Sequence, residues 1–301
     1  MAVVPAQAAD GPCLPLWPGG LAPLDTPLAQ PERMVERSDD PALPDRYVDH
    51  ISTPCMTVHR PARPNGVGVL VLPGGGYQRV VLDKEGSALL PDFVERGGLT
   101  LFVLRYRLPG EGRTDVQAAL ADAQRALRLI RAGAGDWGLD PGRIGVMGFS
   151  AGGHLAARLG TGFATGTYPA VDKADSLPAR PDFQLLIYPV IDMEGPDTHA
   201  GSRQRLLGNA PDAAALHRFS MQHQASADTP PTFLLHAQDD EAVPVGNSLL
   251  FHRALLQAGV PTQMHIFPRG GHGFGVRGTV GLTVAAWPRL ALDWIHALPE
   301  D

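Results

Sequence analysis

Short apolar runs alternate with amphipathic stretches along most of the chain after residue 46. Six runs have this character: VGVLVL (67–72), LTLFVLRYRL (99–108), RIGVMGF (143–149), FQLLIYPV (183–190), TFLLHA (232–237) and QMHIFP (263–268). Runs of this length that are rich in β-branched residues and lack polar alternation are typical of strands buried on both faces of a parallel sheet. They predict the strands of one mostly parallel sheet.

Helical patterns fill intervals between these predicted strands. In the stretch 114–138 the apolar residues that recur at helical spacing are Ala119, Leu120, Ala123, Leu127 and Ile130. Gly133 is a suitable stop for this helix, and further helices are expected at 245–259 and 282–298, where Pro288 should bend or restart the last one. Alternating strands and helices predict a doubly wound α/β domain, with reactive groups on loops at the carboxyl ends of the strands.

Two segments do not follow this alternation. Residues 1–46 are rich in Pro and Gly, so we expect an extended arm that Trp17 anchors on the α/β domain of residues 47–301. Residues 191–229 are polar and partly helical. This stretch is too long for a simple connection and too short for an independent domain, so we expect a small cap-like insert.

Composition and charge narrow the classes of partner. Hydrophobic residues make up 44% of the 301 residues and charged residues 19%, an ordinary globular balance. The formal net charge is −6 without a clustered Lys/Arg stripe, so we expect no nucleic-acid partner. No apolar run approaches the roughly 18 residues of a membrane-spanning helix, so we expect no membrane partner either. The sequence does not determine the oligomeric state.

The cysteines and the first residues bear on the cellular compartment. Cys13 and Cys55 have neither metal-ligand spacing nor a CxxC arrangement; they could pair, but separate thiols are our expectation. Ala6 and Ala8 match the A-x-A of a signal-peptide cleavage site, although a basic start and a full apolar stretch are missing. We expect a periplasmic or secreted protein if residues 1–8 are a signal-peptide remnant, and a cytoplasmic one otherwise.

The stretch GFSAGG supplies a candidate nucleophile. Ser150 stands between the predicted strand at 143–149 and the helix-competent run AGGHLAARLG. A G-x-S-x-G motif in this setting is typical of a nucleophile elbow, in which a sharp strand-to-helix turn exposes the serine hydroxyl. Glycines are needed at both flanks because side chains there would collide across the turn. The alternative is a capping serine in a Gly-rich turn.

A nucleophilic serine needs a base and a carboxylate that orients the base. The stretch HAQDDEAVP places Asp239 and Asp240 directly after the predicted strand at 232–237, and PRGGHGFG places His272 after the last predicted strand. Each of these residues could instead have a purely structural role, since acidic pairs often begin turns and most histidines lie at the surface or pack against other side chains. The chain order Ser, Asp, His is nevertheless the one expected for an α/β-hydrolase.

The Gly-rich stretch VLVLPGGGYQRV offers donors for an oxyanion. The backbone amides of Gly75 and Gly76 can turn inward after an early strand, and the amide of Ala151 is the third candidate donor. A phosphate-binding loop is the rival for any glycine run. GGGY lacks both the G-x-G-x-x-G spacing and a following Lys-Ser/Thr, so an oxyanion hole is the better interpretation.

Taken together these motifs resemble a known family. LPGGGY, KEG, RYRLP, DAQRALRLIR, DPGRIGVMGFSAGGHLAA, LLIYPV, HAQDDEAVP and GGHGFG, with the N-terminal LPLWPGG, resemble the acetylxylan-esterase-like α/β-hydrolase esterases, near the hormone-sensitive-lipase branch. The resemblance runs from about Leu14 to Trp294. The chain differs from the lipase-like branch at Pro73, where that branch usually has a histidine before the glycines.

The resemblance implies an α/β-hydrolase fold and a role for each candidate residue. Ser150 would be the nucleophile, His272 the base and Asp239, the first acid of the pair, its orienting partner, with Asp240 as the fallback. We therefore expect a serine carboxylic-ester hydrolase that works through an acyl-enzyme, with no cofactor and no metal. Its partner would be a small-molecule or oligosaccharide ester, and the favoured reaction removes acetyl groups from xylan-type poly- or oligosaccharides.

Three alternatives remain beside this reading. The chain could be a general short-chain carboxylesterase, since the acyl and sugar specificity follow only from the resemblance. A peptidase of the prolyl-oligopeptidase kind has the same residue order but usually carries a large propeller domain, for which this chain has no room. A non-catalytic binding module would be expected to lack one of the three candidate residues.

Other conspicuous polar residues are expected to have structural roles. Supporting ion pairs are predicted for Glu85, Arg105, Arg107, Asp122 and Arg125. His154 should pack in the first turn of the helix after Ser150. His199, on the insert, is expected to be a solvated loop histidine, with contact to a sugar as the alternative.

Overall fold

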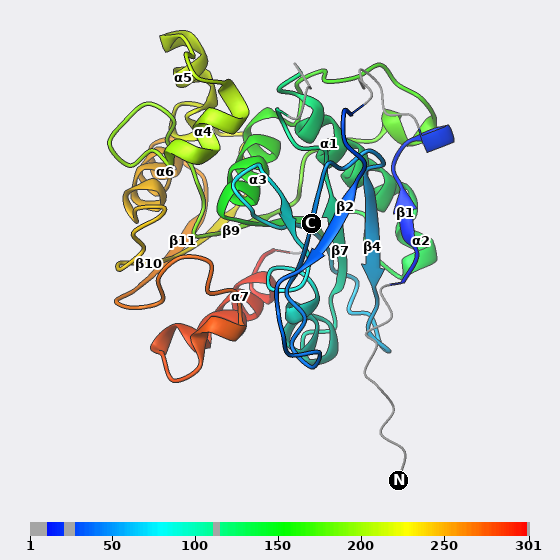
Figure 1. The fold of residues 1–301 in the computed structure, drawn as a ribbon. Helices are drawn as coiled ribbons and strands as arrows, with labels where there is room; N and C mark the ends of the chain where they lie inside the picture. Colours follow the sequence, from blue (N-terminus) through cyan, green and yellow to red (C-terminus); the bar gives the residue numbers. More distant parts are fainter. Residues whose placement is uncertain (1–10, 21–27, 111–114, 300–301) are drawn as a thin grey trace.

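The computed structural model describes residues 11–20, 28–110 and 115–299, so the A-x-A stretch at Ala6 and Ala8 lies outside the described residues. Its central feature is one eight-stranded sheet (Figure 1). The strands, in spatial order, are β1 (Cys13–Pro15), β4 (Cys55–His59), β7 (Thr100–Arg105), β5 (Gly68–Leu72), β8 (Ile144–Phe149), β9 (Gln184–Ile187), β10 (Thr232–Ala237) and β11 (Thr262–Phe267). The six strands from β7 to β11 in this order pair in parallel. Strand β4 pairs antiparallel with β7, and β1 pairs antiparallel with β4.

The parallel part of the sheet consists of the six strands predicted from the apolar runs. Within it, Leu70 of β5 pairs with Phe102 of β7 on one side and with Val146 of β8 on the other. Residues 68–72 and 144–149 are buried throughout, as expected for strands covered on both faces. The antiparallel strands β1 and β4 carry no comparable apolar run, and the hydrophobic pattern did not predict them.

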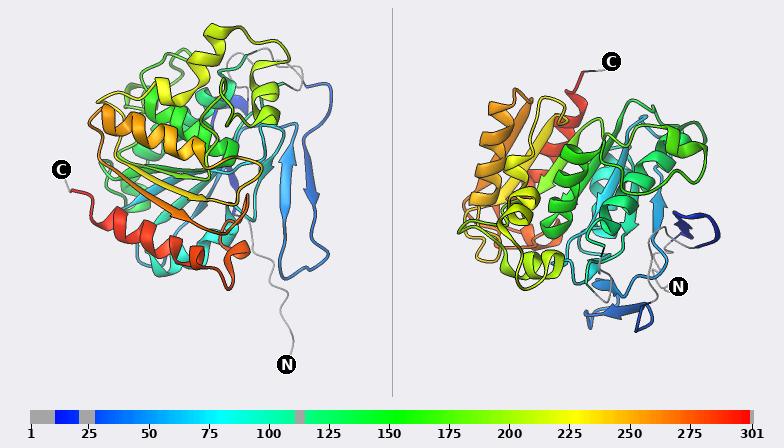
Figure 2. Two further views of the ribbon diagram at one scale, coloured as in Figure 1. Left: turned by 90° about the vertical axis from the view of Figure 1, so that its left-hand side faces the viewer. Right: turned by 90° about the horizontal axis from the view of Figure 1, so that it is seen from above.

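Helices cover both faces of this sheet, which confirms the doubly wound α/β class (Figure 2). The long helices are α1 (Ala118–Ala132), α3 (Ser150–Gly162), α6 (Gly246–Gln257) and α7 (Trp287–His296), with a short α2 (Ala134–Trp137) after α1. Side chains of α1, α3 and α6 belong to one hydrophobic cluster, whereas α7 and the π-helical segment Leu90–Arg96 belong to a second. Gly133 follows α1 and Pro288 lies in the first turn of α7, as predicted.

A second, three-stranded sheet lies beside the central one and was not predicted. It consists of β2 (Arg33–Glu36), β3 (Arg46–Asp49) and β6 (Val80–Val81), all antiparallel. In Figure 2 these first strands project from the body of the α/β domain. Because β6 follows the Gly-rich stretch at 74–76, this sheet brings part of the N-terminal segment next to the loop expected to bind an oxyanion.

The N-terminal segment is fastened at two points. Trp17 is 3% exposed, and its indole Nε1–H donates to Asp122 Oδ1 at 2.9 Å, so it anchors this segment as expected. Cys13 and Cys55 form a disulfide, which corrects the expectation of separate thiols. The pairing of β1 with β4 brings their Cα atoms to 5.5 Å, a separation that a disulfide can span.

Residues 191–229 carry α4 (Ala200–Leu207), α5 (Ala213–Phe219) and a short 3-10 helix at Met221–His223. In Figure 1, α4 and α5 stand at one edge of the molecule, above α6 and α3. Leu206, Phe219 and Met221 are buried in the same cluster as α1 and α3, so the insert packs on the main core. In the part of the chain that the structure describes, no helix is long and apolar enough to cross a bilayer.

Ion pairs surround α1, as expected for Arg107, Asp122 and Arg125. Arg107 Nη2 and Asp122 Oδ1 are 2.8 Å apart and both side chains are buried. Arg125 Nη1 lies 3.0 Å from Asp175 Oδ1. Asp122 and Arg125 therefore face the interior although they are charged, because their partners compensate for the loss of water.

Candidate active site

Ser150 lies at the turn between β8 and α3, with a φ of 53°. This left-handed conformation is unusual for a residue with a side chain and is typical of a nucleophile elbow. The flanking glycines allow the turn to pack closely. A Cβ atom on Gly148 would lie 2.3 Å from the Gly152 carbonyl oxygen, and one on Gly152 would lie 2.1 Å from the Leu72 carbonyl oxygen. The turn thus requires glycines on both sides of Ser150, as the motif predicts.

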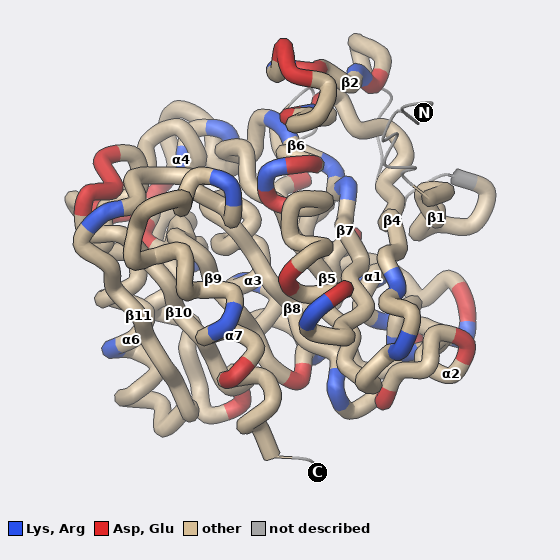
Figure 3. Tube along the Cα trace, turned by 90° about the horizontal axis from the view of Figure 1, so that it is seen from below, with Lys and Arg blue, Asp and Glu red and all other residues tan. Residues whose placement is uncertain are grey.

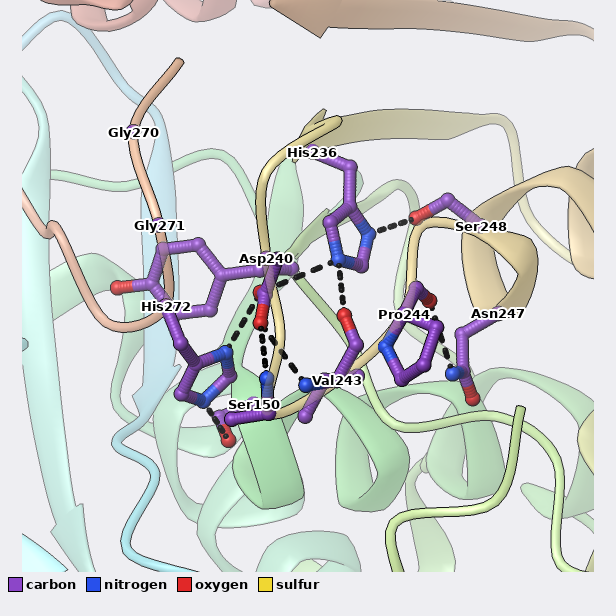
Figure 4. Close-up of polar contacts among 12 residues, drawn as sticks. Ser150, His236, Asp240, Val243, Pro244, Asn247, Ser248, Gly270, Gly271 and His272 are labelled. Atoms are coloured by element: carbon purple, nitrogen blue, oxygen red, sulfur yellow. Dashed lines mark hydrogen bonds and ion pairs between the residues drawn. The ribbon is translucent and has the colours of Figure 1, made fainter. Parts of the chain in front are cut away.

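The structure brings Ser150 and His272 together across 122 positions of sequence (Figure 4). The Ser150 Oγ and His272 Nε2 atoms are 2.8 Å apart, and the His272 Nδ1 and Asp240 Oδ2 atoms are 2.7 Å apart. All three side chains come from loops or turns at the carboxyl ends of strands β8, β10 and β11. In such an arrangement the imidazole can take the proton from the serine hydroxyl, and the carboxylate can stabilise the resulting imidazolium.

Asp240 occupies a buried and strongly polar position. Its Oδ1 accepts hydrogen bonds from the backbone N–H groups of Ala242 at 3.0 Å and Val243 at 2.8 Å. Its Oδ2 also lies 3.3 Å from His236 Nε2. Burial opposes ionisation, but the hydrogen bonds from His236 and His272 outweigh it and hold the pKa of Asp240 well below its usual range. Asp240 is therefore a carboxylate at neutral pH, as an orienting partner must be.

Asp239 does not contact the His272 ring, which corrects the expectation that the first acid of the pair orients this histidine. Its exposed carboxylate accepts hydrogen bonds from the backbone N–H groups of Gly270 at 2.9 Å and Gly271 at 2.7 Å. These two glycines immediately precede His272. Neighbouring residues in the turn after β10 thus point to different targets: Asp240 binds the imidazole, and Asp239 holds the loop that carries it.

The Gly-rich loop after β5 faces the same site. Gly75 and Gly76 have φ values of 131° and 66°, and both line a cleft that also contains Ser150 and His272. A Cβ atom on Gly75 would lie 2.2 Å from the Arg79 carbonyl oxygen, so this position requires glycine. Ala151 follows Ser150 in α3, whose first amides have no acceptor within the helix. Gly75 and Gly76 thus line the same cleft as Ser150, and Ala151 is the residue that follows it.

Glu85 links the glycine loop to the loop of His272. Its Oε2 accepts from the Gly74 N–H at 2.7 Å, and its Oε1 accepts from the Tyr188 hydroxyl at 2.9 Å. That hydroxyl in turn accepts from the Gly275 N–H at 3.1 Å. The expected ion pair at Glu85 is therefore replaced by hydrogen bonds. Burial raises the pKa of Glu85, against the effect of these donors.

The cleft above Ser150 has a volume of about 560 Å³ and a largely polar lining. His199 lines it, which corrects the expectation of a solvated loop histidine. Its Nδ1 accepts from the Ser202 N–H at 3.2 Å, so Nε2 carries the proton in the neutral ring. Burial, followed by the charge of His272, lowers the pKa of His199. A neutral donor from the insert therefore stands opposite Gly76, whose Cβ position would be 4.0 Å from His199 Cε1.

Sequence reasoning missed two residues that support the site. Tyr188 follows β9 with a φ of 37°, and its ring centroid lies 5.2 Å from that of His272. His236 lies in β10 and is held by Ser248 Oγ at 2.8 Å and the Val243 carbonyl oxygen at 2.9 Å. The only signal was a tyrosine and a histidine within otherwise apolar strand runs. His154 packs as expected, with its Nδ1 and the Tyr77 hydroxyl 2.8 Å apart.

One group of side chains has the donor types of a metal site. Ligand atoms of Glu194, His217 and His223 all lie within 4.8 Å of one another on the surface of the insert. Glu194 and His223 line a different cleft from the one that contains Ser150. This group is therefore separate from the cleft that contains Ser150.

Fold and site together define the class of this protein. A mostly parallel sheet with a serine at a strand-to-helix turn, facing a histidine on the loop after the last strand, is the α/β-hydrolase fold. The chain belongs to the BD-FAE family, whose model matches residues 56–255.

Similar proteins include enzymes that act on xylan or on esters. The chain is 33% identical to an acetylxylan esterase of Xylanibacter ruminicola over 73% of its length, and 38% identical to endo-1,4-beta-xylanase B of Butyrivibrio fibrisolvens over 69%. It spans only 43% and 32% of the length of these two relatives. The crystal structure of an acetyl ester-xyloside bifunctional hydrolase from Caldicellulosiruptor lactoaceticus matches with a TM-score of 0.79 at 36% identity, covering 97% of this chain and 98% of that one.

Proposed function

We propose that this protein is a serine esterase that removes small acyl groups, acetyl foremost, from xylan-type poly- or oligosaccharides. The observation that carries the proposal is the hydrogen-bonded chain from Ser150 through His272 to Asp240 at the floor of a polar cleft. The xylan part of the proposal is supported by the names of the acetylxylan esterase and the acetyl ester-xyloside hydrolase to which the chain is similar.

In this mechanism Ser150 attacks the ester carbonyl while His272 takes its proton. Asp240 keeps His272 in the tautomer that accepts at Nε2 and stabilises the imidazolium that forms. The amides of Gly75, Gly76 and Ala151 would bind the oxyanion of the tetrahedral intermediate.

The second half of the reaction reuses the same groups. His272 gives its proton to the departing sugar hydroxyl, which leaves the acyl group on Ser150. Water then attacks this acyl-enzyme with His272 again as the base, and the carboxylic acid is released. Every proton moves through one imidazole, so the reaction needs no cofactor.

The size and polarity of the cleft favour a small acyl group and a sugar. Its lining includes glycines at 75, 76, 201 and 273 and side chains such as Gln78 and Gln204, and few apolar groups. A long acyl chain needs an extended apolar surface, because each buried methylene contributes only about 0.8 kcal/mol. A general short-chain carboxylesterase is the second candidate, because a small polar cleft would also admit simple acetate esters.

Acetate release from acetylated xylo-oligosaccharides, compared with hydrolysis of nitrophenyl acetate, tests the proposal. We expect kcat/KM to be higher for the oligosaccharide, because sugar contacts add binding energy that nitrophenol lacks. Hydrolysis of nitrophenyl acetate alone, without acetate release from the sugar, would leave only the carboxylesterase.

A series of nitrophenyl esters from two to twelve carbons tests the acyl specificity. We expect kcat/KM to be highest for acetyl or propionyl and to fall at least about tenfold by octanoyl, which is about 1.4 kcal/mol of transition-state stabilisation. A maximum at eight carbons or beyond would contradict the small-acyl assignment.

A further inference from the structure

The cleft above Ser150 is lined by positive side chains although the chain has a net charge of −6. Its cationic lining residues are Arg37, Arg79, Lys84 and Arg205. They come from four places: the residue after β2, the loop before β6, the loop after β6, and the last turn of α4. In Figure 3, Lys and Arg positions are seen around β6 and on α4, on facing sides of the same end of the molecule.

Glu85 offsets only part of these positive charges. It is the only acidic residue among the described residues that line the cleft. It is 4% exposed, and its carboxylate oxygens are already engaged by the Gly74 N–H and the Tyr188 hydroxyl. Its charge also acts on Lys84, but it is a single carboxylate beside four cationic lining residues. The solvent-facing part of the cleft is therefore positive.

Three of the four cations are available for a ligand. Arg37 is engaged, since its Nη2 lies 2.7 Å from Asp45 Oδ1. Within the described ranges, no carboxylate forms an ion pair with Arg79, Lys84 or Arg205. The guanidinium of Arg79 lies 4.9 Å from the centroid of the Tyr47 ring, which limits its orientations without neutralising its charge.

The positions of Lys84 and Arg205 indicate where a charged group would lie. Lys84 Nζ would be 3.9 Å from a Cβ atom on Gly273, the residue that follows His272. Arg205 is exposed on α4 and, with Gln204, lines both this cleft and a neighbouring hollow of about 610 Å³. The cations thus line the cleft with part or all of each side chain exposed to solvent. A two-carbon acyl group held at Ser150 would leave this solvent-exposed part of the cleft to the alcohol part of the ester.

We propose that this cationic rim, formed by Arg79, Lys84 and Arg205, binds a carboxylate on the saccharide part of the substrate. The preferred substrate is then an acylated xylan-type oligosaccharide that carries a uronic acid unit near the scissile ester. This inference rests on the proposed esterase function. Guanidinium groups recognise carboxylates through paired hydrogen bonds, and a positive cleft also attracts anionic substrates from solution.

The test compares acetylated xylo-oligosaccharides with and without a glucuronic acid branch. At low ionic strength we expect kcat/KM to be about tenfold higher for the branched substrate, because three cations line the cleft that would receive the carboxylate. Added salt at about 0.5 M should reduce this ratio toward one, since the rim is open to solvent. A second substrate pair, nitrophenyl hemisuccinate and nitrophenyl acetate, places the carboxylate on the acyl group instead.

Substitutions of rim residues, with a matched control on α4, show whether the rim causes the preference for the branched substrate. Arg205→Gln should lower the ratio of kcat/KM for the branched over the unbranched substrate by about threefold, and adding Lys84→Gln should lower it further. Arg203→Gln is the control, because Arg203 lies on the same helix but does not line the cleft. It removes one positive charge and should leave the ratio unchanged. Thermal melting checks that each variant is folded.

The outcomes separate the two proposals. If both oligosaccharides lose acetate at equal rates, the cationic-rim proposal is wrong and the esterase function stands. If neither loses acetate while nitrophenyl acetate is hydrolysed, the saccharide function itself fails. A preference for the hemisuccinate without a preference for the glucuronic acid branch would move the carboxylate to the acyl side and overturn the assignment to the saccharide.

Discussion

The floor of the cleft and its rim are constructed differently. The floor, Ser150 with His272 and Asp240, consists of residues at turns that follow strands, and they are joined by hydrogen bonds of 2.7 and 2.8 Å. The rim, Arg79, Lys84 and Arg205, consists of exposed or half-buried side chains on loops and on α4. Packing and hydrogen bonds determine the positions of the floor side chains. For the rim side chains, the fold determines only their charge and their approximate location.

This difference indicates how chemistry and specificity are divided. In the proposed mechanism, reaction at the floor requires donors and acceptors aligned within a few tenths of an ångström, and buried turns at strand ends provide that alignment. Electrostatic attraction at the rim acts over several ångströms and tolerates mobile side chains. We therefore expect substitutions in the floor to change kcat by orders of magnitude. Substitutions in the rim should change the choice of substrate by small factors.

The largest effect is expected for Ser150→Ala. Loss of the nucleophile should lower kcat for nitrophenyl acetate by about 10⁵-fold to 10⁶-fold, because the three groups act as a unit. Ser176→Ala is the matched control, because Ser176 is exposed and does not line the cleft, and this variant should retain full activity. A Ser150→Ala variant with a tenth of the original kcat would remove Ser150 from the mechanism.

The adjacent acids give the sharpest test of the floor. Asp240→Asn should lower kcat by about 10³-fold to 10⁴-fold, because an amide favours the wrong tautomer of His272 and does not stabilise the imidazolium. Asp239→Asn keeps an oxygen that can accept from Gly270 and Gly271, so its kcat should fall less than about tenfold. If Asp239→Asn lowered kcat more than Asp240→Asn, Asp239 would be the residue that orients His272.

Loss of the disulfide should change stability and leave the floor intact. Replacing Cys13 and Cys55 together by Ser should lower the free energy of unfolding by about 2 to 4 kcal/mol, since the bridge closes a long loop in the unfolded chain. Urea denaturation measures this change, and reduction of the unmodified protein should give the same result. We expect kcat at 25 °C to stay within about twofold. If reducing agent left the midpoint of urea denaturation unchanged, the disulfide would not be stabilising.

Two buried carboxylates near Ser150, Glu85 and Asp240, should make contributions to stability that respond to pH with opposite signs. The folded-state pKa of Glu85 is raised, so its contribution to stability is present below the unfolded pKa of about 4.3 and is lost as pH rises through the folded value. The folded-state pKa of Asp240 is lowered, so its contribution is present above about 3.9 and is lost as pH falls.

Unfolding free energies at several pH values check these signs. Glu85→Gln, which has no charge at any pH, should gain stability relative to the unmodified protein as pH rises from about 4 to 8. Asp240→Asn should lose less stability, relative to the unmodified protein, at pH 3 than at pH 7. Parallel curves for a variant and the unmodified protein would show that the corresponding carboxylate titrates alike in both states.

Much of the fold follows from the sequence because its signals are local. Apolar runs predict the six strands of the parallel sheet, and Gly133 and Pro288 mark helix boundaries. The strands of the second sheet escaped prediction. They have only two to four residues, and β2 and β3 are partly exposed, so their hydrophobic pattern is too short to be recognised.

The site divides in the same way. The serine turn, the histidine loop and the acidic pair could be predicted from the sequence, because each is a short motif that follows directly on its own strand. The choice between Asp239 and Asp240 required the folded structure, because the side chains of adjacent residues in one turn point in different directions and the local sequence pattern does not distinguish them.

Contacts between distant segments also required the tertiary structure. Cys13 and Cys55 meet because β1 and β4 pair across 42 positions of sequence, and nothing in either cysteine's own neighbourhood encodes that pairing. The same holds for the positive cleft in a chain of negative net charge. A count of charges does not depend on where they lie, whereas the electrostatic potential at Ser150 depends on distances that folding alone establishes.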